Sequence, residues 1–262
     1  MLMRSLRRGE AQRAAQRLTS TAARALSNTP RDIGWLLDRN QAWRKLQNPL
    51  LFEAAARGQS PQYLWIGCAD SRVPAETLMG LDMGMLFVHR NIANQALGND
   101  MNCMSVLQYA VDVLKVPHII VCGHYDCGGV KAALMKTQMP SPLDNWLRNI
   151  RDVHRMHKQE LSAIATMDDR VNRLVELNAI EQCVNIFKTG VVQRRRWATF
   201  HGDEPYTQPR IHAMVYNPAD GALTKLPVDF KEVLDEIRDV YEFELAPLLP
   251  QDLGTCEELT KE

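Results

Sequence analysis

Residues 63–72 read YLWIGCADSR, an uninterrupted apolar run that gives way to glycine, cysteine and then polar side chains. The run is continuous rather than alternating, which is typical of a strand buried on both faces in a parallel sheet. Pro61 stands at its entry and Gly67-Cys68 at its end. We therefore expect a central strand that delivers Cys68 and the residues after it to the carboxyl end of a sheet.

Short apolar runs of the same kind alternate with stretches of helical periodicity along the rest of the chain. Strands that alternate with helices predict parallel βαβ units, and the turn at 217–221 predicts a hairpin. The predicted fold class is α/β: a mostly parallel central β-sheet flanked by helices, with an antiparallel edge hairpin and an N-terminal helical arm. The expected strands are 63–66, 85–88, 118–122, 210–216 and a return strand ending at Leu226, and the expected helices are two within 32–57, then 74–80, 104–114, one after Gly129, 143–160, 171–188 and 230–245.

The composition excludes several classes of protein. With 262 residues, 45% of them hydrophobic and 24% charged, the chain can form one large α/β domain and is not disordered overall. No run of about 18 apolar residues occurs, so we expect no membrane insertion. Residues 30–262 carry 25 basic and 30 acidic residues. This net negative charge offers no basic surface for a phosphate backbone, and we expect no nucleic-acid partner.

Residues 1–29 differ from the rest of the chain, because they contain six Arg, no Lys and a single acid, Glu10. A segment rich in Arg, Ala, Ser and Thr and poor in acids is typical of a mitochondrial targeting presequence. A basic surface helix that docks on a partner is the alternative, and the protein would then be cytoplasmic. We expect residues 1–29 to be a targeting extension and the protein to be mitochondrial.

Two predicted strand ends combine metal-ligand side chains with glycine, at the place where open α/β sheets bind their ligands. They are CADSR at 68–72 and GHYDCGG at 123–129. His124 and Cys127 are three residues apart, so one turn can direct both toward a single ion, and Cys68 can join them if the two strand ends are neighbours. A Cys₂His set leaves the fourth tetrahedral position of zinc free for water, which is typical of a catalytic site.

Asp70 and Arg72 can control that fourth position. Bound zinc lowers the pKa of water to about 7, so that a hydroxide nucleophile exists at neutral pH. If the guanidinium of Arg72 holds Asp70 in a bidentate pair, the carboxylate stays off the metal and can accept a hydrogen bond from the hydroxide. If the pair breaks, Asp70 can ligate the metal and exclude water. A structural zinc site would not need this adjustable pair.

The motifs at 68–72 and 123–129 resemble the two signatures of the β-class carbonic anhydrases. The resemblance extends from about Asp32 to the 240s, through FVHRNIAN at 87–94 and LQYAV at 107–111. It covers most of the chain outside residues 1–29 and implies a carbonic anhydrase domain at 30–262.

By this resemblance one zinc ion per subunit is bound by Cys68, His124 and Cys127, and Asp70 with Arg72 forms the catalytic dyad. The implied reaction is the reversible hydration of carbon dioxide to bicarbonate and a proton, by attack of a zinc-bound hydroxide. The resemblance also implies closure of the site by Asp70, dependent on pH and bicarbonate.

Four further positions match residues that line the narrow substrate pocket of the family: Gln59, Phe87, Ile92 and Tyr109. The resemblance implies that Gln59 and Tyr109 come from the neighbouring subunit, so that a homodimer completes the active site. Carbon dioxide is small and nonpolar, which suits a pocket with apolar walls. In the family such dimers commonly pair, and we expect a homodimer or a homotetramer.

Trp65, Arg90 and Tyr216 match a triad that binds bicarbonate at a non-catalytic site in the allosteric subgroup of the family. A guanidinium beside an indole and a phenol hydroxyl is suited to a small oxyanion. Anion binding there would favour the arrangement with Asp70 on zinc, so bicarbonate would inhibit at lower pH. The alternative is that Trp65 is a plain core residue.

Several other residues receive structural interpretations. Asp126 stands where similar bacterial sequences tend to carry glycine, and we expect its carboxylate to cap the following helix rather than to tune the zinc. The run Arg194-Arg195-Arg196 is expected to be a solvated helix end. Cys103, Cys122 and Cys183 are expected to be small buried hydrophobic residues.

Two other functions remain open from the sequence. Carbon disulfide or carbonyl sulfide hydrolysis is carried out by relatives of this fold, and substrate assays would separate it from carbon dioxide hydration. A non-catalytic zinc or anion-binding protein would retain zinc without hydration activity at alkaline pH. The Asp70–Arg72 pair argues against this last function.

Overall fold

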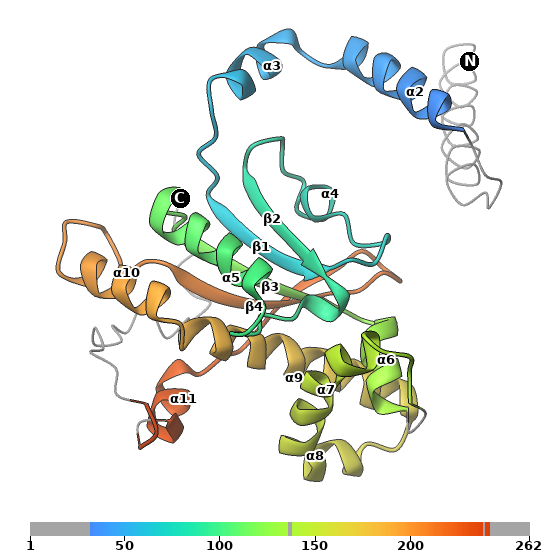
Figure 1. Cartoon of the computed structure of the whole chain (residues 1–262), viewed down its shortest axis with the longest axis vertical. Coiled ribbons are helices and arrows are strands. Elements are labelled where there is room, and N and C mark those ends of the chain that lie inside the picture. Colours follow the sequence, from blue (N-terminus) through green and yellow to red (C-terminus); the bar gives the residue numbers. More distant parts are fainter. Residues whose placement is uncertain (1–31, 136–137, 238, 242–262) are drawn as a thin grey trace, which may run out of the picture. The chain divides into compact units, whose positions relative to one another are not determined.

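The computed structural model describes residues 32–135, 138–237 and 239–241, in two compact units divided between Ala56 and Arg57 (Figure 1). The expected targeting extension at 1–29 lies outside the described residues. Among the helices that are described, none combines the length and the apolar character needed to cross a bilayer.

The second unit is built on a five-stranded sheet with the order β2-β1-β3-β4-β5. Strands β1 to β4 are mutually parallel, and β5 pairs antiparallel with β4 as the edge hairpin. This confirms the predicted fold class. The strands are β1 (Tyr63–Cys68), β2 (Leu86–Asn91), β3 (His118–His124), β4 (Arg210–Tyr216) and β5 (Leu223–Leu226).

Burial explains why the continuous apolar runs became the central strands. In β1 and β3 every residue after the first is buried, as expected for strands covered on both faces. In β4 buried residues alternate with half-buried ones, and β2 at the edge of the sheet is only partly buried. Strand β3 continues to His124, so the predicted metal ligand is itself the last residue of a buried strand.

Different helices cover the two faces of the sheet. The larger core cluster contains Leu64 and Ile66 of β1 together with residues of the long helix α9, which runs along β3 and β4 (Figure 1). The smaller cluster contains Trp65 on the opposite face, packed with residues of α4. The helices and helical turns of this unit are α4 (Ala75–Met79), η1 (Ile92–Asn94), α5 (Met101–Gln108), η2 (Tyr109–Val113), α6 (Gly128–Leu134), α7 (Leu143–Met156), α8 (Lys158–Ala163), α9 (Met167–Phe187), α10 (Gly190–Phe200) and α11 (Phe230–Ile237).

Several predicted helices differ from the structure. The helix expected over 104–114 begins at Met101, the helix expected over 230–245 ends at Ile237, and α10 was not predicted. The helix expected over 143–160 is interrupted at His157, between α7 and α8. The helix expected from residue 171 begins earlier, at Met167, because the Thr166 side chain accepts from the amide of Asp169 at 3.1 Å and caps the first turn. Asp168 and Asp169 therefore lie in that first turn, where acidic side chains are favourable.

The arginine run at 194–196 lies within α10 and is not wholly solvated as expected. Arg196 is 5% exposed, and its Nη1 donates to the carbonyl of Pro209 at 3.0 Å. Its guanidinium also lies over the ring of Phe187, 5.5 Å from the centroid. A backbone carbonyl and an aromatic face therefore compensate the burial of this cation.

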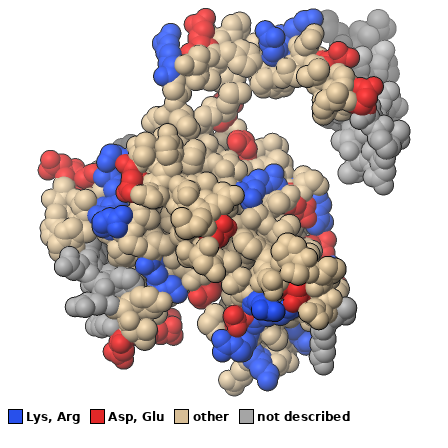
Figure 2. All heavy atoms as spheres, in the orientation of Figure 1, with Lys and Arg blue, Asp and Glu red and all other residues tan. Residues whose placement is uncertain are grey.

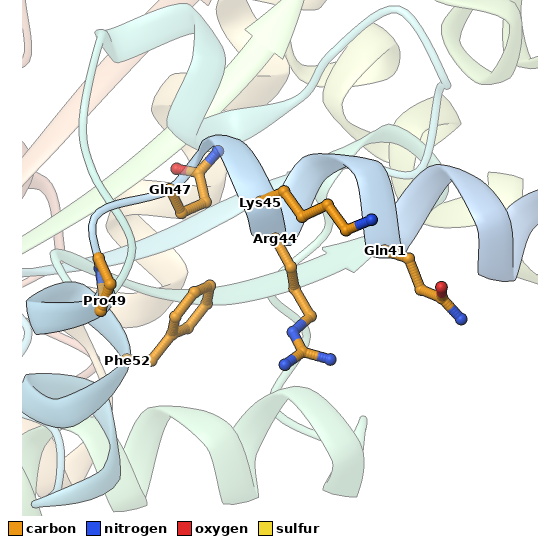
Figure 3. Close-up of a pocket in the computed structure, with 6 residues that line it drawn as sticks. All are labelled: Gln41, Arg44, Lys45, Gln47, Pro49 and Phe52. Carbon is orange, nitrogen blue, oxygen red and sulfur yellow. The ribbon is translucent and has the colours of Figure 1, made fainter.

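The first unit confirms the expected pair of helices broken near Asn48-Pro49: α2 (Ile33–Leu46) and α3 (Pro49–Ala56). Asp32 caps α2 by accepting from the amide of Trp35 at 2.9 Å. No residue of either helix is buried. A concave region of about 310 Å³ lies between the two helices. Figure 3 shows the six side chains that line it: Gln41, Arg44, Lys45, Gln47, Pro49 and Phe52. This region contains none of the predicted metal ligands.

Charged side chains of both signs are interspersed over the face shown in Figure 2. Oppositely charged side chains also pair along helices, as Asp152 does with Arg155 at 3.4 Å on α7. Both side chains of this pair are more than 60% exposed, so the pair contributes little to stability.

Candidate metal centre

Three donor side chains converge at the carboxyl ends of two neighbouring strands. Because β1 and β3 are parallel neighbours, with Gly67 opposite Cys122, their ends bring Cys68 close to His124. Cys127 follows as the N-cap of α6. One ligand atom from each of Cys68, His124 and Cys127 lies within 4.8 Å of the others, and all three residues are buried. The convergence predicted from the strand ends is therefore present.

The imidazole of His124 is oriented for a metal ion. Its Nδ1 lies 3.0 Å from the carbonyl of Tyr125, and a carbonyl can only accept, so Nδ1 carries the proton. Nε2 is left with a free lone pair, buried and without a hydrogen-bond partner. An unpaired buried nitrogen costs about 1–3 kcal/mol, unless a bound cation uses the lone pair.

The two cysteines also indicate a cation site. The pKa of Cys68 is lowered to about 4, mainly because Cys127 donates to the sulfur and also because the amides of Asp70 and Ala93 stabilise the thiolate, against the effect of burial. The pKa of Cys127 is raised, because its proton is shared with the Cys68 thiolate and because it is buried. A divalent ion would allow both sulfurs to ionise. Two thiolates and one imidazole with a vacant position are a fitting donor set for zinc.

The carboxylate of Asp70 is held beside this centre by Arg72. Nε and Nη2 of the guanidinium donate to Oδ1 and Oδ2 at 3.0 and 2.8 Å, a bidentate pair. This pairing is the main reason that the pKa of Asp70 is lowered to about 2. Oδ2 lies 3.9 Å from Nε2 of His124. Asp70 is thus ionised and close to the ligands, but its carboxylate is paired with Arg72.

Asp126 does not cap the following helix, and that expectation is wrong. The N-cap of α6 is Cys127, and no side chain caps this helix. Oδ2 of Asp126 accepts from Nη1 of Arg72 at 3.0 Å, and Oδ1 accepts from Lys131. Sequence reasoning missed this contact, because it joins residues 54 positions apart in two irregular segments.

Of the four predicted pocket residues, only Ile92 lies near the ligands within one protomer. It follows Asn91, which pairs with Cys68 across the sheet, and a Cβ on Gly129 would meet its side chain at 2.8 Å. Phe87 lies four residues before Asn91 in β2, a separation of roughly 13 Å along the strand.

The aromatic pocket residues lie together. Phe87 stacks on Tyr109 with 5.7 Å between the ring centroids, and 45% of Tyr109 is exposed. Gln59 is exposed in the segment before β1. Phe87 and Tyr109 therefore occupy one place on the protomer.

Trp65 and Tyr216 share the smaller core cluster, and the indole Nε1 of Trp65 is buried without a partner. Gly67 lies against that nitrogen, and a Cβ there would collide with it. Arg90 donates from Nε to the carbonyl of Cys68 at 2.8 Å and from Nη2 to the carbonyl of Asp70. Arg90 thus supports the backbone that carries Cys68 and Asp70.

A second cluster of metal-ligand types, not identified from the sequence, contains His89, Asp100 and Cys103. In this cluster, hydrogen bonds already occupy polar atoms of Asp100 and His89. Asp100 caps α5 by accepting from Asn102 at 3.0 Å, and Nε2 of His89 accepts from Nδ2 of Asn91 at 3.2 Å. Burial raises the pKa of the Cys103 thiol to about 12. This thiol is neutral, in contrast to Cys68.

Comparison with known proteins agrees with this geometry. A family model for carbonic anhydrase matches residues 63–223. A carbonic anhydrase of Emericella nidulans is 50% identical over 209 residues, which cover 79% of this chain and 88% of that protein. A β-carbonic anhydrase of Aspergillus fumigatus has a similar structure, with a TM-score of 0.71 and 34% identity over 80% of this chain and 98% of the other. A tetrameric β-carbonic anhydrase of Sordaria macrospora gives a TM-score of 0.69 and 35% identity over 74% and 95% of the two chains.

Proposed function

Since the chain belongs to the β-class carbonic anhydrase family, we propose that it catalyses the reversible hydration of carbon dioxide to bicarbonate and a proton at the Cys68–His124–Cys127 centre. The observation that carries this proposal is the buried, unpartnered Nε2 of His124, which lies beside two thiols and a paired Asp70 carboxylate. Zinc bound by these residues would supply a Lewis acid that lowers the pKa of a water molecule toward neutrality.

The chain's own residues position the reactants. Asp70 is ionised and held by Arg72, so one of its oxygens can accept a hydrogen bond from the nucleophile and fix its orientation. Arg72 also keeps that carboxylate from the ligand position beside His124. Arg90 holds the carbonyls of Cys68 and Asp70 and so fixes the backbone on which both side chains depend.

We further propose that Phe87 and Tyr109 line the substrate pocket of the neighbouring subunit as a pair. Phe87 lies four residues before Asn91 in β2, which keeps it away from the ligands of its own protomer. Strand β2 is an edge strand, and its Val88 is 36% exposed. Met101 at the start of α5 and Val113 at the end of η2 are also exposed, by 74% and 58%. Such an edge is suited to an interface. The tetrameric relative from Sordaria macrospora supports a homo-oligomer.

Regulation by closure is the finer part of the proposal. When the Asp70–Arg72 pair breaks, Asp70 can turn toward His124 and occupy the fourth ligand position. The unpartnered Nε1 of Trp65, with Arg90 and Tyr216, would bind bicarbonate and favour this closed arrangement. If Trp65→Phe left both the pH profile and the inhibition by bicarbonate unchanged, the proposed bicarbonate site would be wrong.

The decisive test measures carbon dioxide hydration against pH, with the zinc content determined on the same sample. We expect about one zinc per subunit and a rate that rises steeply on the alkaline side, because the nucleophile is then ionised. Retained zinc without hydration at alkaline pH would instead indicate a non-catalytic binding protein. Turnover of carbonyl sulfide or carbon disulfide in place of carbon dioxide would indicate the related hydrolase.

We also propose that residues 1–29 deliver the protein to mitochondria, on the basis of their arginine-rich, acid-poor composition. Fusion of residues 1–29 to a fluorescent reporter tests this proposal. Import and processing of the reporter would support it, and a diffuse cytoplasmic reporter would contradict it.

A further inference from the structure

We propose that Asp126 is a positioning residue, which holds the guanidinium of Arg72 in the orientation that pairs with Asp70. This inference rests on the proposed role of the Asp70–Arg72 dyad. The guanidinium lies between two carboxylates: Nε and Nη2 donate to Asp70, and Nη1 donates to Asp126 Oδ2 at 3.0 Å. Nη2 also lies 3.3 Å from the carbonyl of Asp126. The two carboxylates bind different edges of the planar guanidinium and can bind it simultaneously.

The backbone of Asp126 supports a role for its side chain. Its φ is 58°, in the left-handed region that glycine occupies freely and other residues rarely adopt. Aspartate tolerates this conformation better than most residues, but glycine would be the least strained choice. The carboxylate does not cap α6. Both of its oxygens instead contact cationic side chains, Arg72 and Lys131. These contacts give a physical reason for a carboxylate at this strained backbone position.

The segment that carries Asp126 is anchored to the rest of the fold. The amide of Tyr125 donates to the carbonyl of Tyr216 on β4 at 2.9 Å, and the Tyr125 hydroxyl donates to Glu176 of α9 at 2.6 Å. The amide of Asp126 lies 3.4 Å from Oδ1 of Asn172, also on α9. Asp126 therefore connects Arg72, in the short loop after β1, to a backbone fixed by β4 and α9.

This connection favours the arrangement in which Asp70 is paired. Without Asp126, the Arg72 side chain would lose a fixed partner and regain rotamer freedom, so pairing with Asp70 would cost more conformational entropy. Arg72 and Asp126 are both about half exposed, at 45% and 53% of their side chains. Loss of an exposed ion pair changes the equilibrium between the arrangement with Asp70 paired to Arg72 and the closed arrangement by only about two- to fivefold. We expect loss of Asp126 to raise the closed fraction by that factor.

The experiment compares the wild type with Asp126→Asn and Asp126→Gly, each loaded with cobalt(II) in place of zinc. Asn keeps the shape of the side chain and tolerates positive φ but lacks the charge, whereas Gly removes the side chain and relaxes the backbone. Replacement of a solvent ligand by the Asp70 carboxylate changes the visible absorption of cobalt. We expect the pH midpoint of this change to move to higher pH by about 0.3–0.7 unit in both variants, which corresponds to the two- to fivefold factor.

The charged groups near Asp126 are Arg72 in the loop after β1 and Lys131 on α6, and Asp168 of α9 acts on Lys131. Lys131→Gln leaves the contact between Asp126 and Arg72 in place, so we expect a smaller alkaline shift. Asp152→Asn removes an exposed carboxylate paired with Arg155 on α7, and it serves as the matched control with no shift. Thermal unfolding of each variant verifies that the fold is retained.

An unchanged cobalt midpoint in both Asp126 variants, or a shift to lower pH, would overturn the inference. A shift in Asp126→Gly alone would indicate a backbone effect and would also overturn it, because Asn removes the same negative charge. The midpoint of carbon dioxide hydration should move with the cobalt midpoint. If the cobalt midpoint moves but no variant hydrates carbon dioxide, the positioning role stands and the proposed function fails.

Discussion

At the scale of single residues, the two clusters of metal-ligand side chains are told apart by their hydrogen bonds. His124 keeps a buried lone pair without a partner, and the pKa of Cys68 is lowered to about 4. In the other cluster His89 is hydrogen-bonded to Asn91 and the pKa of Cys103 is raised to about 12. A thiolate binds a soft cation at neutral pH, whereas a thiol must first lose its proton. The first cluster should therefore bind the metal.

This difference predicts opposite results for two cysteine substitutions. Cys68→Ala removes a ligand, so the zinc retained after dialysis against a weak chelator should fall at least about tenfold. Cys103→Ala, a buried cysteine replaced in the same way, should keep about one zinc per subunit. Metal analysis and thermal unfolding with and without chelator check both results. If only the Cys103 variant lost zinc, the metal would belong to the cluster of His89, Asp100 and Cys103, and our assignment would be wrong.

The ligand residues could be predicted because strand ends are visible in a sequence and parallel strands end at the same side of a sheet. The contact between Arg72 and Asp126 could not be predicted in this way. It depends on the conformation of two irregular segments and on a left-handed backbone at Asp126, where glycine would be expected. The orientation of His124 likewise depends on the carbonyl of Tyr125, and no local sequence pattern reports such a contact.

At the scale of elements, the position of His124 depends on the close packing of β3 against α9. A Cβ on Gly123 would meet Val175 of α9 at 2.9 Å from its side chain and at 3.3 Å from its carbonyl oxygen. Gly123→Ala should therefore displace the helix and destabilise the fold by about 1–3 kcal/mol. It should also weaken zinc binding, because the next residue is His124.

Gly98→Ala is the matched control for this packing. A Cβ there would meet nothing within 4 Å, so the free energy of unfolding should change by no more than about 0.5 kcal/mol. Denaturant unfolding of both variants tests the difference. Equal stability of the two variants would show that the helix can move away from Gly123 without cost.

Helices proved harder to predict than strands, for a physical reason. The central strands are continuous apolar runs, and burial on both faces follows from that pattern. The pattern of α10 is interrupted by Arg194, Arg195 and Arg196, and the partner of Arg196 is the carbonyl of Pro209, 13 residues away. The end of α7 at His157 has no glycine or proline to mark it. Tertiary contacts decide both cases, so local propensity was insufficient.

At the scale of the whole molecule, the proposed function implies an active site that is shared between subunits. Cys68, His124 and Cys127 belong to one protomer, whereas the stacked pair of Phe87 and Tyr109 lies too far along β2 to face them. A site divided in this way allows two inactive chains to repair each other. The chain with intact ligands needs only an intact aromatic pair from its neighbour.

The corresponding experiment mixes two variants, Cys68→Ala without the metal centre and Tyr109→Ala with an incomplete pocket. Each alone should hydrate carbon dioxide slowly. After dissociation and random reassembly as twofold dimers, about a quarter of all sites should combine intact ligands with an intact Tyr109, and activity should return in proportion. A Cys103→Ala chain in place of the Cys68 variant controls for reassembly. If the mixture stays as slow as its components although mixed dimers form, then Tyr109 serves its own protomer, and the separation along β2 must be overcome by a rearrangement within one chain.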